Sequence, residues 1–223
     1  MRVNVLQHTS NEGPGAIASW AHARGHELYI YHPDQFGILP KAAETDLLVI
    51  LGGPMNPNDP LPWLKQERDL IKELLKEHKP LFGVCLGGQQ IAESLGAEVH
   101  AAPHKEVGWA PVYRQSDAIP GIPEKIEVLH WHQDMFELPK GAKLLFSSDL
   151  VKNQGFLYGD NVLGLQFHFE PLADNLREIA INDSQYPLEN NDLQQTPAEI
   201  IAHGVPDANK AILSLLLDFI CRK

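Results

Sequence analysis

Residues 79–88 read KPLFGVCLGG, and this stretch decides the fold because the chain changes here from strand to helix around one cysteine. Its first half is a short apolar run that opens with a proline and is bounded by glycines, which favours a buried strand. The pattern Gly-x-Cys-x-Gly follows at Gly83, Cys85 and Gly87, and residues 89–95 continue as an amphipathic helix. A sharp strand-to-helix turn of this kind is typical of an exposed nucleophile.

Cys85 has two interpretations at this point. A nucleophilic cysteine gains from the position, because the start of a helix directs backbone N–H groups and a positive dipole end at the sulfur and favours the thiolate. The alternative is a buried cysteine in a tight turn that performs no chemistry. The flanking glycines fit both, since neighbouring backbone approaches the turn closely in either case.

The segments before this stretch predict a parallel sheet with helices on both faces. Apolar runs at 3–6, 26–31 and 46–51 are typical of strands, and helical patterns at 16–24 and 63–78 separate them. Strands that alternate with helices in this way indicate a parallel sheet covered on both sides.

The second half of the chain predicts short strands that follow one another without long helices between them. The expected strands are 98–113, 125–131, 143–147, 155–158 and 161–169. Further helices are expected from Leu172, from Thr196-Pro197 and from a cap at Asp207. We therefore expect one α/β domain over residues 1–223, a mostly parallel twisted sheet with additional antiparallel strands on which the helices of 196–223 pack.

Composition excludes several classes of protein. Of the 223 residues 21% are charged and 43% hydrophobic, which is typical of a soluble globular chain. The net charge of −11 comes without a Lys/Arg cluster, so we expect no nucleic-acid surface. The two cysteines, Cys85 and Cys221, lie too far apart to suggest a disulfide framework, which favours a cytoplasmic location. No apolar run reaches membrane-spanning length, so we expect no membrane association.

A cysteine nucleophile needs a base and a group that orients the base. His168 and Glu170 lie two residues apart in QFHFEP, at the end of an expected strand, and would face the same side. Glu170 would then hold the imidazole of His168, and His168 would deprotonate Cys85. The alternative is a strand-end histidine beside a solvated glutamate.

A turn at Gly52-Gly53-Pro54 ends the expected strand at 46–51. Next to a nucleophile, such a turn can present the backbone N–H of Gly53, and the N–H of Leu86 would be its partner in an oxyanion hole. Taken alone, Gly-Gly-Pro is only a turn.

Three stretches in this order, LGGPM (51–55), GVCLGGQ (83–89) and GLQFHFEP (164–171), resemble the class I glutamine amidotransferases. EVGW and HWHQDMFELPKGA resemble, in particular, proteins similar to the amidotransferase half of GMP synthase, and the resemblance covers nearly the whole chain. It implies a flavodoxin-like α/β fold and a Cys-His-Glu triad that removes ammonia from glutamine through a γ-glutamyl thioester. The residues it implies are Cys85 as nucleophile, His168 as base, Glu170 as its orienter, Gly53 and Leu86 as oxyanion donors, and Gln89 at the glutamyl head.

The stretch HWHQD places His130, His132 and Asp134 on one side of an expected strand. A metal site is one interpretation, but no cysteine or further histidine nearby in the sequence completes a ligand set, so we expect neither a metal nor a cofactor. The resemblance implies that this stretch lies near the substrate pocket, and we assign His132 to substrate binding.

Three classes of function remain. The first is an amidotransferase subunit that takes glutamine and supplies ammonia to a separate synthase, because nothing in the sequence resembles the ATP pyrophosphatase domain of full GMP synthase. The second is a free-standing hydrolase of γ-glutamyl amides or peptides that uses the same acyl-enzyme chemistry. The third is a non-catalytic relative that binds a ligand or a partner, and the complete set Cys85, His168 and Glu170 argues against it.

Overall fold

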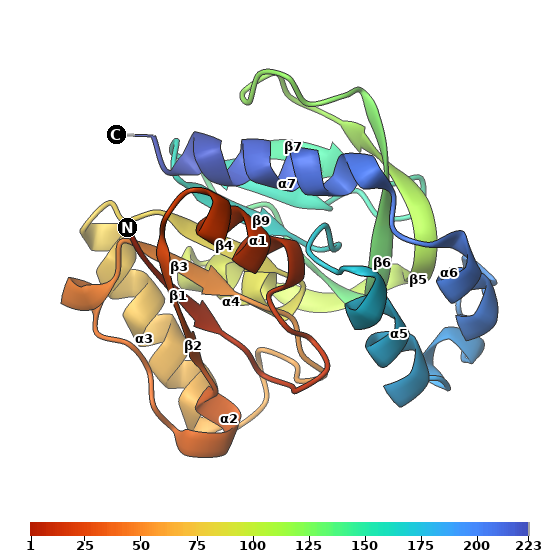
Figure 1. The fold of residues 1–223 in the computed structure, drawn as a ribbon, viewed down its shortest axis with the longest axis horizontal. Helices are drawn as coiled ribbons and strands as arrows, with labels where there is room; N and C mark the ends of the chain where they lie inside the picture. The colour runs from red at the N-terminus through yellow and green to blue at the C-terminus, as the bar shows by residue number, and fades with distance from the viewer. Residues whose placement is uncertain (223) are drawn as a thin grey trace.

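The computed structural model describes residues 1–222 and contains a nine-stranded mixed sheet in the order β2-β1-β3-β4-β9-β8-β7-β5-β6 (Figure 1). The parallel half consists of β2 (Glu27–Tyr31), β1 (Arg2–Leu6), β3 (Leu47–Ile50), β4 (Leu81–Val84) and β9 (Val162–Leu165). The antiparallel half adds β8 (Gly155–Tyr158), β7 (Lys143–Ser147), β5 (Val99–Arg114) and β6 (Lys125–Phe136).

Helices cover both faces of the sheet. On one face lie α1 (Gly15–Ala23) and α7 (Asp207–Ile220), which pack side by side in Figure 1. On the other face lie α3 (Pro62–Lys76) and α4 (Leu86–Ser94), while α5 (Ala173–Asn182) and α6 (Pro197–His203) lie beside β5 and β6. The predicted fold class, an α/β sheet flanked by helices with additional antiparallel strands, is confirmed.

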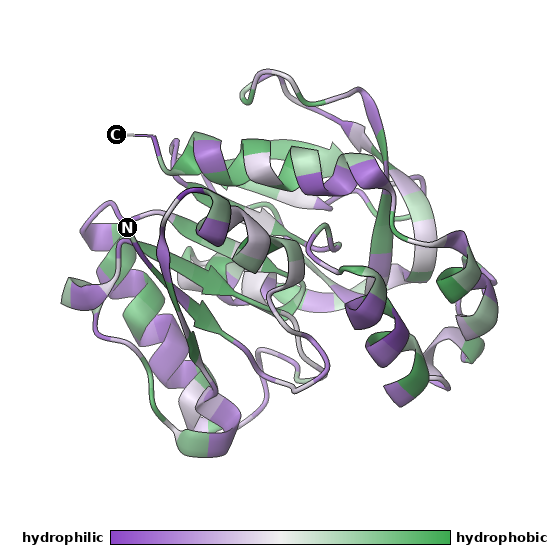
Figure 2. Cartoon of the chain, viewed as in Figure 1, coloured by the Kyte–Doolittle hydropathy of each residue, from purple (hydrophilic) through white to green (hydrophobic). Residues whose placement is uncertain are grey.

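Alternating apolar side chains explain why the central strands need both layers of helices. Val49 of β3 packs toward α1 and α7, whereas its neighbours Leu48 and Ile50 pack toward α3 and α4. In β4, Phe82 packs toward α1 and α7, and Leu81 packs toward α3 and α4. Figure 2 shows these strands as a hydrophobic centre between helices that carry both hydrophobic and hydrophilic residues.

Two boundaries near the predicted site differ from the sequence expectation. α4 begins at Leu86 instead of residue 89, because the two glycines after Leu86 fit the tightly packed first turn. β9 ends at Leu165 instead of residue 169, so His168 and Glu170 lie in an extended segment beyond the strand. There, a single bridge between Leu129 and His168 replaces continuous strand pairing.

The caps of the last two helices differ from each other. Thr196 caps α6 as predicted, and its side chain accepts a hydrogen bond from the N–H of Glu199. Asp207, predicted to cap α7, is instead its first residue and follows Pro206 at the cap position. Short helical turns that the sequence pattern does not predict occur at α2 (Pro33–Phe36), Ala42–Glu44 and Tyr186–Leu188.

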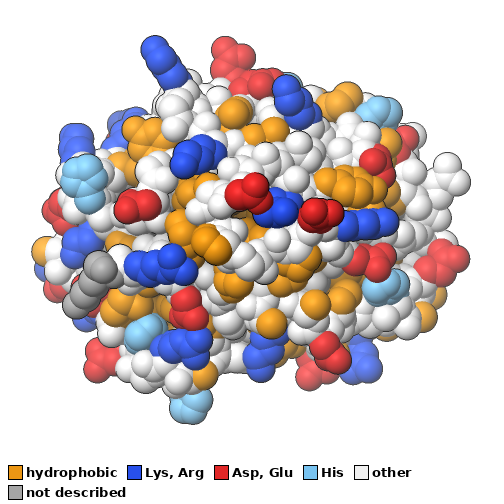
Figure 3. Space-filling view, turned by 90° about the horizontal axis from the view of Figure 1, so that it is seen from above, with side chains coloured by type: hydrophobic (Ala, Val, Ile, Leu, Met, Phe, Trp, Pro, Cys, Tyr) orange, Lys and Arg blue, Asp and Glu red, His pale blue; other side chains and the backbone are white. Residues whose placement is uncertain are grey.

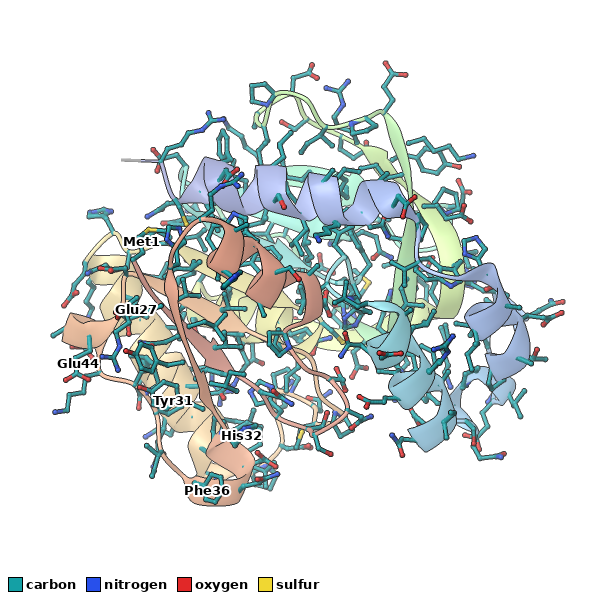
Figure 4. The ribbon with its side chains drawn as sticks, viewed as in Figure 1. Met1, Glu27, Tyr31, His32, Phe36 and Glu44 are labelled. Carbon is teal, nitrogen blue, oxygen red and sulfur yellow. The ribbon has the colours of Figure 1, made fainter. Side chains whose placement is uncertain are left out.

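The outer surface has two simple features. At the β2 edge of the sheet, Tyr31 and His32 lie near Phe36, whose side chain points away from the protein and is 66% exposed (Figure 4). On the face seen in Figure 3, acidic and basic side chains are interspersed.

Within residues 1–222, no helix has both the length and the apolar character that crossing a bilayer requires.

Candidate active site

Cys85 occupies a sharp turn between β4 and α4. Its backbone angles, φ 50° and ψ −113°, are a combination that residues with a side chain rarely adopt. Such a conformation costs on the order of 1–3 kcal/mol and persists only where the surrounding structure fixes it. Cys85 is 9% exposed and borders a cavity of about 280 Å³.

Three glycines allow the backbone to close around this turn. If Gly83 carried a side chain, its Cβ atom would overlap the carbonyl of Gly87. A Cβ atom added to Gly87 would overlap the carbonyl of Ile50 in β3. A Cβ on Gly88 would collide with the carbonyl of Leu165 in β9. Close backbone contacts with both strands that neighbour β4 therefore explain the pattern Gly-x-Cys-x-Gly-Gly.

His168 and Glu170 meet in the extended segment after β9. Nδ1 of His168 lies 2.5 Å from Oε1 of Glu170, and the two side chains are 3% and 7% exposed. The N–H of His168 donates to the carbonyl of Leu129 in β6 at 2.9 Å. The carbonyl of Glu170 accepts from the N–H of Ala16 in α1 at 2.8 Å, and a Cβ on Gly15 would overlap it. Contacts with two distant parts of the chain thus fix both residues.

The environment of His168 favours its charged form. Burial lowers its pKa, but the Glu170 carboxylate and the Cys85 thiol outweigh burial and raise the pKa of His168 well above its ordinary value. The side chains of Cys85 and His168 both lie beside Gly52. A Cβ atom added to Gly52 would lie 3.5 Å from Cβ of Cys85 and 3.2 Å from Cε1 of His168. The charged form of the imidazole is therefore favoured where it lies beside Glu170 and Cys85.

A second buried histidine, His8, holds the Gly52–Gly53 peptide. Its Nδ1 donates to the Gly52 carbonyl at 3.0 Å, its Nε2 lies 2.8 Å from Oε1 of Glu67, and it stacks on Trp63. Although burial opposes it, Glu67 and the Gly52 carbonyl raise the pKa of His8, as expected for a ring with an acceptor at each nitrogen. Because C=O and N–H point in opposite directions in a trans peptide, this contact turns the Gly53 N–H away from His8.

Gly53 and Leu86 lie next to each other beside Cys85. A Cβ on Gly53 would be 3.3 Å from Cδ2 of Leu86, and Gly53 borders the same cavity as Cys85. Leu86 is the first residue of α4, where a backbone N–H has no acceptor within the helix.

The cavity beside Cys85 is acidic. Glu12, Asp134 and Asp183 line it, and no Lys or Arg of residues 1–222 does; the other lining residues are Asn11, Gly53, Pro54, Met55, Gln89, Trp131, His132, Gln133, Ile179 and Tyr186. Burial, with the Glu170 and Asp183 charges adding to it, raises the pKa of Glu12 although His168 opposes this.

The two residues assigned to substrate binding differ in what they present to this cavity. Gln89 is 4% exposed, and its Nε2 donates to Oε1 of Gln166 at 3.2 Å. Both ring nitrogens of His132 have neighbours inside the protein, Nδ1 at 3.1 Å from the Asp134 carbonyl and Nε2 at 3.3 Å from Glu106. His132 therefore contributes ring carbons, rather than a free nitrogen, to the wall of the cavity.

Sequence patterns alone do not single out Glu12, His8, Glu67 or Glu106. Glu12 and His8 belong to the loop after β1, and Glu67 lies in α3, so no spacing in the sequence relates them to Cys85. Two signals are available: Glu106 belongs to EVGW, one of the stretches that carry the family resemblance, and Glu67 falls on the buried side of the α3 helical pattern, where a charged residue needs a partner.

The comparisons with known proteins identify the family. The family profile described as glutamine amidotransferase class-I matches residues 16–181, about three quarters of the chain. The chain belongs to the class I glutamine amidotransferases. A crystal structure of a glutamine amidotransferase from Thermotoga maritima is similar at 30% identity with a TM-score of 0.90, over 100% of this chain and 99% of that one.

Curated amidotransferase relatives differ in their named functions. The glutamine amidotransferase-like protein YfeJ of Salmonella typhimurium is 34% identical over 76% of both chains. One subunit of the glutamine-hydrolyzing GMP synthase of Sulfolobus acidocaldarius is 34% identical over 57% of this chain and 68% of that one. Gamma-glutamyl peptidase 5 of Arabidopsis thaliana is 28% identical over 65% of this chain and 61% of that one.

The two cysteines of this amidotransferase should react at different rates with iodoacetamide. Burial and Asp218 raise the pKa of the Cys221 thiol to about 12, whereas Cys85 borders the cavity close to His168, whose charged form is favoured. At neutral pH, we expect peptide mapping after brief treatment to find the label on Cys85, and Cys85→Ala to remove the fast reaction. Faster labelling of Cys221 would contradict this assignment.

Proposed function

We propose that this amidotransferase hydrolyses the γ-amide of glutamine or of a γ-glutamyl compound through a Cys85–His168–Glu170 triad. The observation that carries the proposal is the strained turn at Cys85 beside a buried imidazole, which lies 2.5 Å from a carboxylate. A nucleophile, its base and the group that orients the base are the parts that acyl transfer requires.

In the first step, the Cys85 sulfur attacks the γ-carbonyl carbon and a bond to nitrogen breaks. The His168 imidazolium gives its proton to the departing nitrogen, so ammonia or an amine leaves in neutral form. The backbone N–H groups of Gly53 and Leu86 hold the negative charge that develops on the carbonyl oxygen. The product is a γ-glutamyl thioester on Cys85.

In the second step, neutral His168 takes a proton from water, and the water oxygen attacks the thioester carbon. The bond to sulfur breaks, glutamate departs, and the Cys85 thiolate and the His168 imidazolium are restored. Glu170 keeps the imidazole in one orientation through both steps and stabilises its charged form.

The acidic cavity suits the α-ammonium group of a glutamyl head. Glu12 lies close to His168 and lines the same cavity as Gln89, which we assign to the same head. With three carboxylates and no cation among the lining residues, the cavity favours a substrate that brings positive charge.

Ammonia supply to a separate synthase is one use of this chemistry, as the relationship to the GMP synthase of Sulfolobus acidocaldarius suggests. Hydrolysis of γ-glutamyl peptides is the second candidate, and the relationship to gamma-glutamyl peptidase 5 favours it. Rapid turnover of γ-glutamyl dipeptides by the isolated protein would select the peptidase. Glutaminase activity that rises only with a partner would select the synthase component.

Removing each member of the triad should give a graded loss of activity. Cys85→Ala should abolish release of glutamate, and His168→Ala should lower kcat by about 10²–10⁴-fold because the proton donor is gone. Glu170→Ala should cost less, since it only loosens the imidazole. The measurement is steady-state glutamate release from glutamine and γ-glutamyl dipeptides, with circular dichroism to check folding. A folded Cys85→Ala protein with normal turnover would refute the triad.

His8 should act on kcat through the Gly52–Gly53 peptide. His8→Leu removes the donor to the Gly52 carbonyl and frees the Gly53 N–H, so kcat should fall by as much as about 10²-fold with KM little changed. His8→Asn places an amide donor near the position of Nδ1 and should recover most of the loss. An equal loss in the two variants, or a change confined to KM, would disprove the positioning role.

Substitution of Glu12 should change KM, in contrast to substitution of His8, which should change kcat. Glu12→Gln keeps the shape of the side chain but removes its charge, so KM for glutamine should rise about tenfold or more, as loss of a charged hydrogen bond would cause. Asp174→Asn is the matched control, because the side chain of Asp174 is 92% exposed and does not line the cavity. Asparagine should be a poor substrate of the wild-type protein and of both variants. Its side chain is one methylene shorter, so asparagine cannot reach Cys85 and the residues assigned to the glutamyl head, Glu12 and Gln89, at the same time. Efficient asparagine turnover would argue against a γ-glutamyl pocket.

A further inference from the structure

Glu106, His130 and His132 form a buried cluster between β5 and β6, behind the wall of the cavity. They are 1%, 0% and 2% exposed. Glu106 pairs directly across the strands with His132, and His130 lies two residues before His132 on the same face. The pairing register thus brings Glu106 next to two histidines that lie more than twenty residues further along the sequence.

The separations of the donor atoms are those of a metal site. His130 Nδ1 and His132 Nε2 are 3.4 Å apart, and Glu106 Oε2 lies 3.3 Å from His132 Nε2 and 3.7 Å from His130 Nδ1. Hydrogen bonds between such groups are normally shorter, at 2.7–3.2 Å. Bonds of 2.0–2.2 Å around a tetrahedral Zn²⁺ place its ligands about 3.3–3.6 Å from one another.

The hydrogen bond made by the other ring nitrogen of His132 directs a lone pair into the cluster. Nδ1 of His132 donates to the Asp134 carbonyl at 3.1 Å, which leaves the lone pair of Nε2 directed at Glu106 and His130. Nε2 of His130 is buried without a hydrogen-bond partner, and with the ring proton on that nitrogen three acceptor atoms converge in a space from which solvent is excluded. An arrangement of this kind needs a cation, either a proton or a metal ion.

Gln154 offers a fourth ligand at the same place. Its amide nitrogen lies 2.5 Å from Glu106 Oε2 and 3.4 Å from His132 Nε2, and its Oε1 is buried without a hydrogen-bond partner. Turning the amide over exchanges the positions of oxygen and nitrogen and would direct Oε1 at the cluster. The side chain would then move about 1 Å away from Glu106 to reach the separation of two tetrahedral ligands.

We propose that Glu106, His130, His132 and Gln154 bind one Zn²⁺ ion, or a divalent ion of the same class, as a structural site. Two imidazoles and a carboxylate are ligands that Zn²⁺ accepts, and four protein ligands leave no open position for catalysis. The ion would stabilise β6, which contacts the candidate active site at two points. The Leu129 carbonyl accepts a hydrogen bond from the His168 N–H, and the Trp131 carbonyl lies 3.9 Å from the Cys85 sulfur. The proposal does not depend on the reaction assigned to Cys85.

The test is the metal content of the purified protein. The protein is refolded from urea with and without Zn²⁺, dialysed against metal-free buffer, and analysed by elemental mass spectrometry and thermal unfolding. We expect one Zn²⁺ per chain and a fall in Tm of about 4 °C or more when the ion is withheld. Co²⁺ in its place should give the intense visible absorption of a tetrahedral site.

Variants connect the ion to the cluster. Glu106→Gln and His130→Gln should each lose the bound ion, whereas His100→Gln should keep it. His100 is the matched control because it forms an exposed pair with Glu137 beside the same two strands. Metal content far below one ion per chain in the wild-type protein, with a Tm indifferent to Zn²⁺, would overturn the proposal in favour of a proton shared by Glu106 and His132. Retention of the ion by both cluster variants would also overturn it.

Discussion

The contact between the start of α4 and the carbonyl groups of its neighbouring strands is the constraint on which the molecule depends. Gly87 packs against the Ile50 carbonyl of β3 and Gly88 against the Leu165 carbonyl of β9, so the helix begins in contact with both strands beside β4. The chain can reach that position from β4 only by passing through an unfavourable conformation at Cys85. Packing of the core around β4 compensates for this strain and fixes the thiol beside the cavity.

Both halves of the sheet contribute to the environment of Cys85. The parallel half supplies the turn itself, whereas β6 of the antiparallel half holds the His168 backbone through the Leu129 carbonyl. The loop after β1 adds Glu12 and His8, and the first turn of α1 holds the Glu170 backbone. The position of the buried imidazole therefore depends on packing throughout the chain rather than on one local motif.

The sequence predicts those parts of this arrangement that depend on local patterns. Apolar runs and glycines locate β3, β4 and the turn at Cys85, because burial on both faces and close backbone approach leave direct marks on composition. The same pattern places the end of β9 too late, since the apolar residues Phe167 and Phe169 continue in an extended segment that no longer pairs as a strand. Glu106 and His8 cannot be found in this way because only strand register and loop packing bring them to the site.

The proposed reaction requires Cys85 to carry a γ-glutamyl group during turnover. The most direct measurement is mass spectrometry of protein quenched in acid while it turns over glutamine, followed by mapping of the modified peptide. We expect a mass increase of one glutamyl group, located on Cys85 and absent from the Cys85→Ala protein. Turnover with no covalent adduct, or an adduct on another residue, would contradict it.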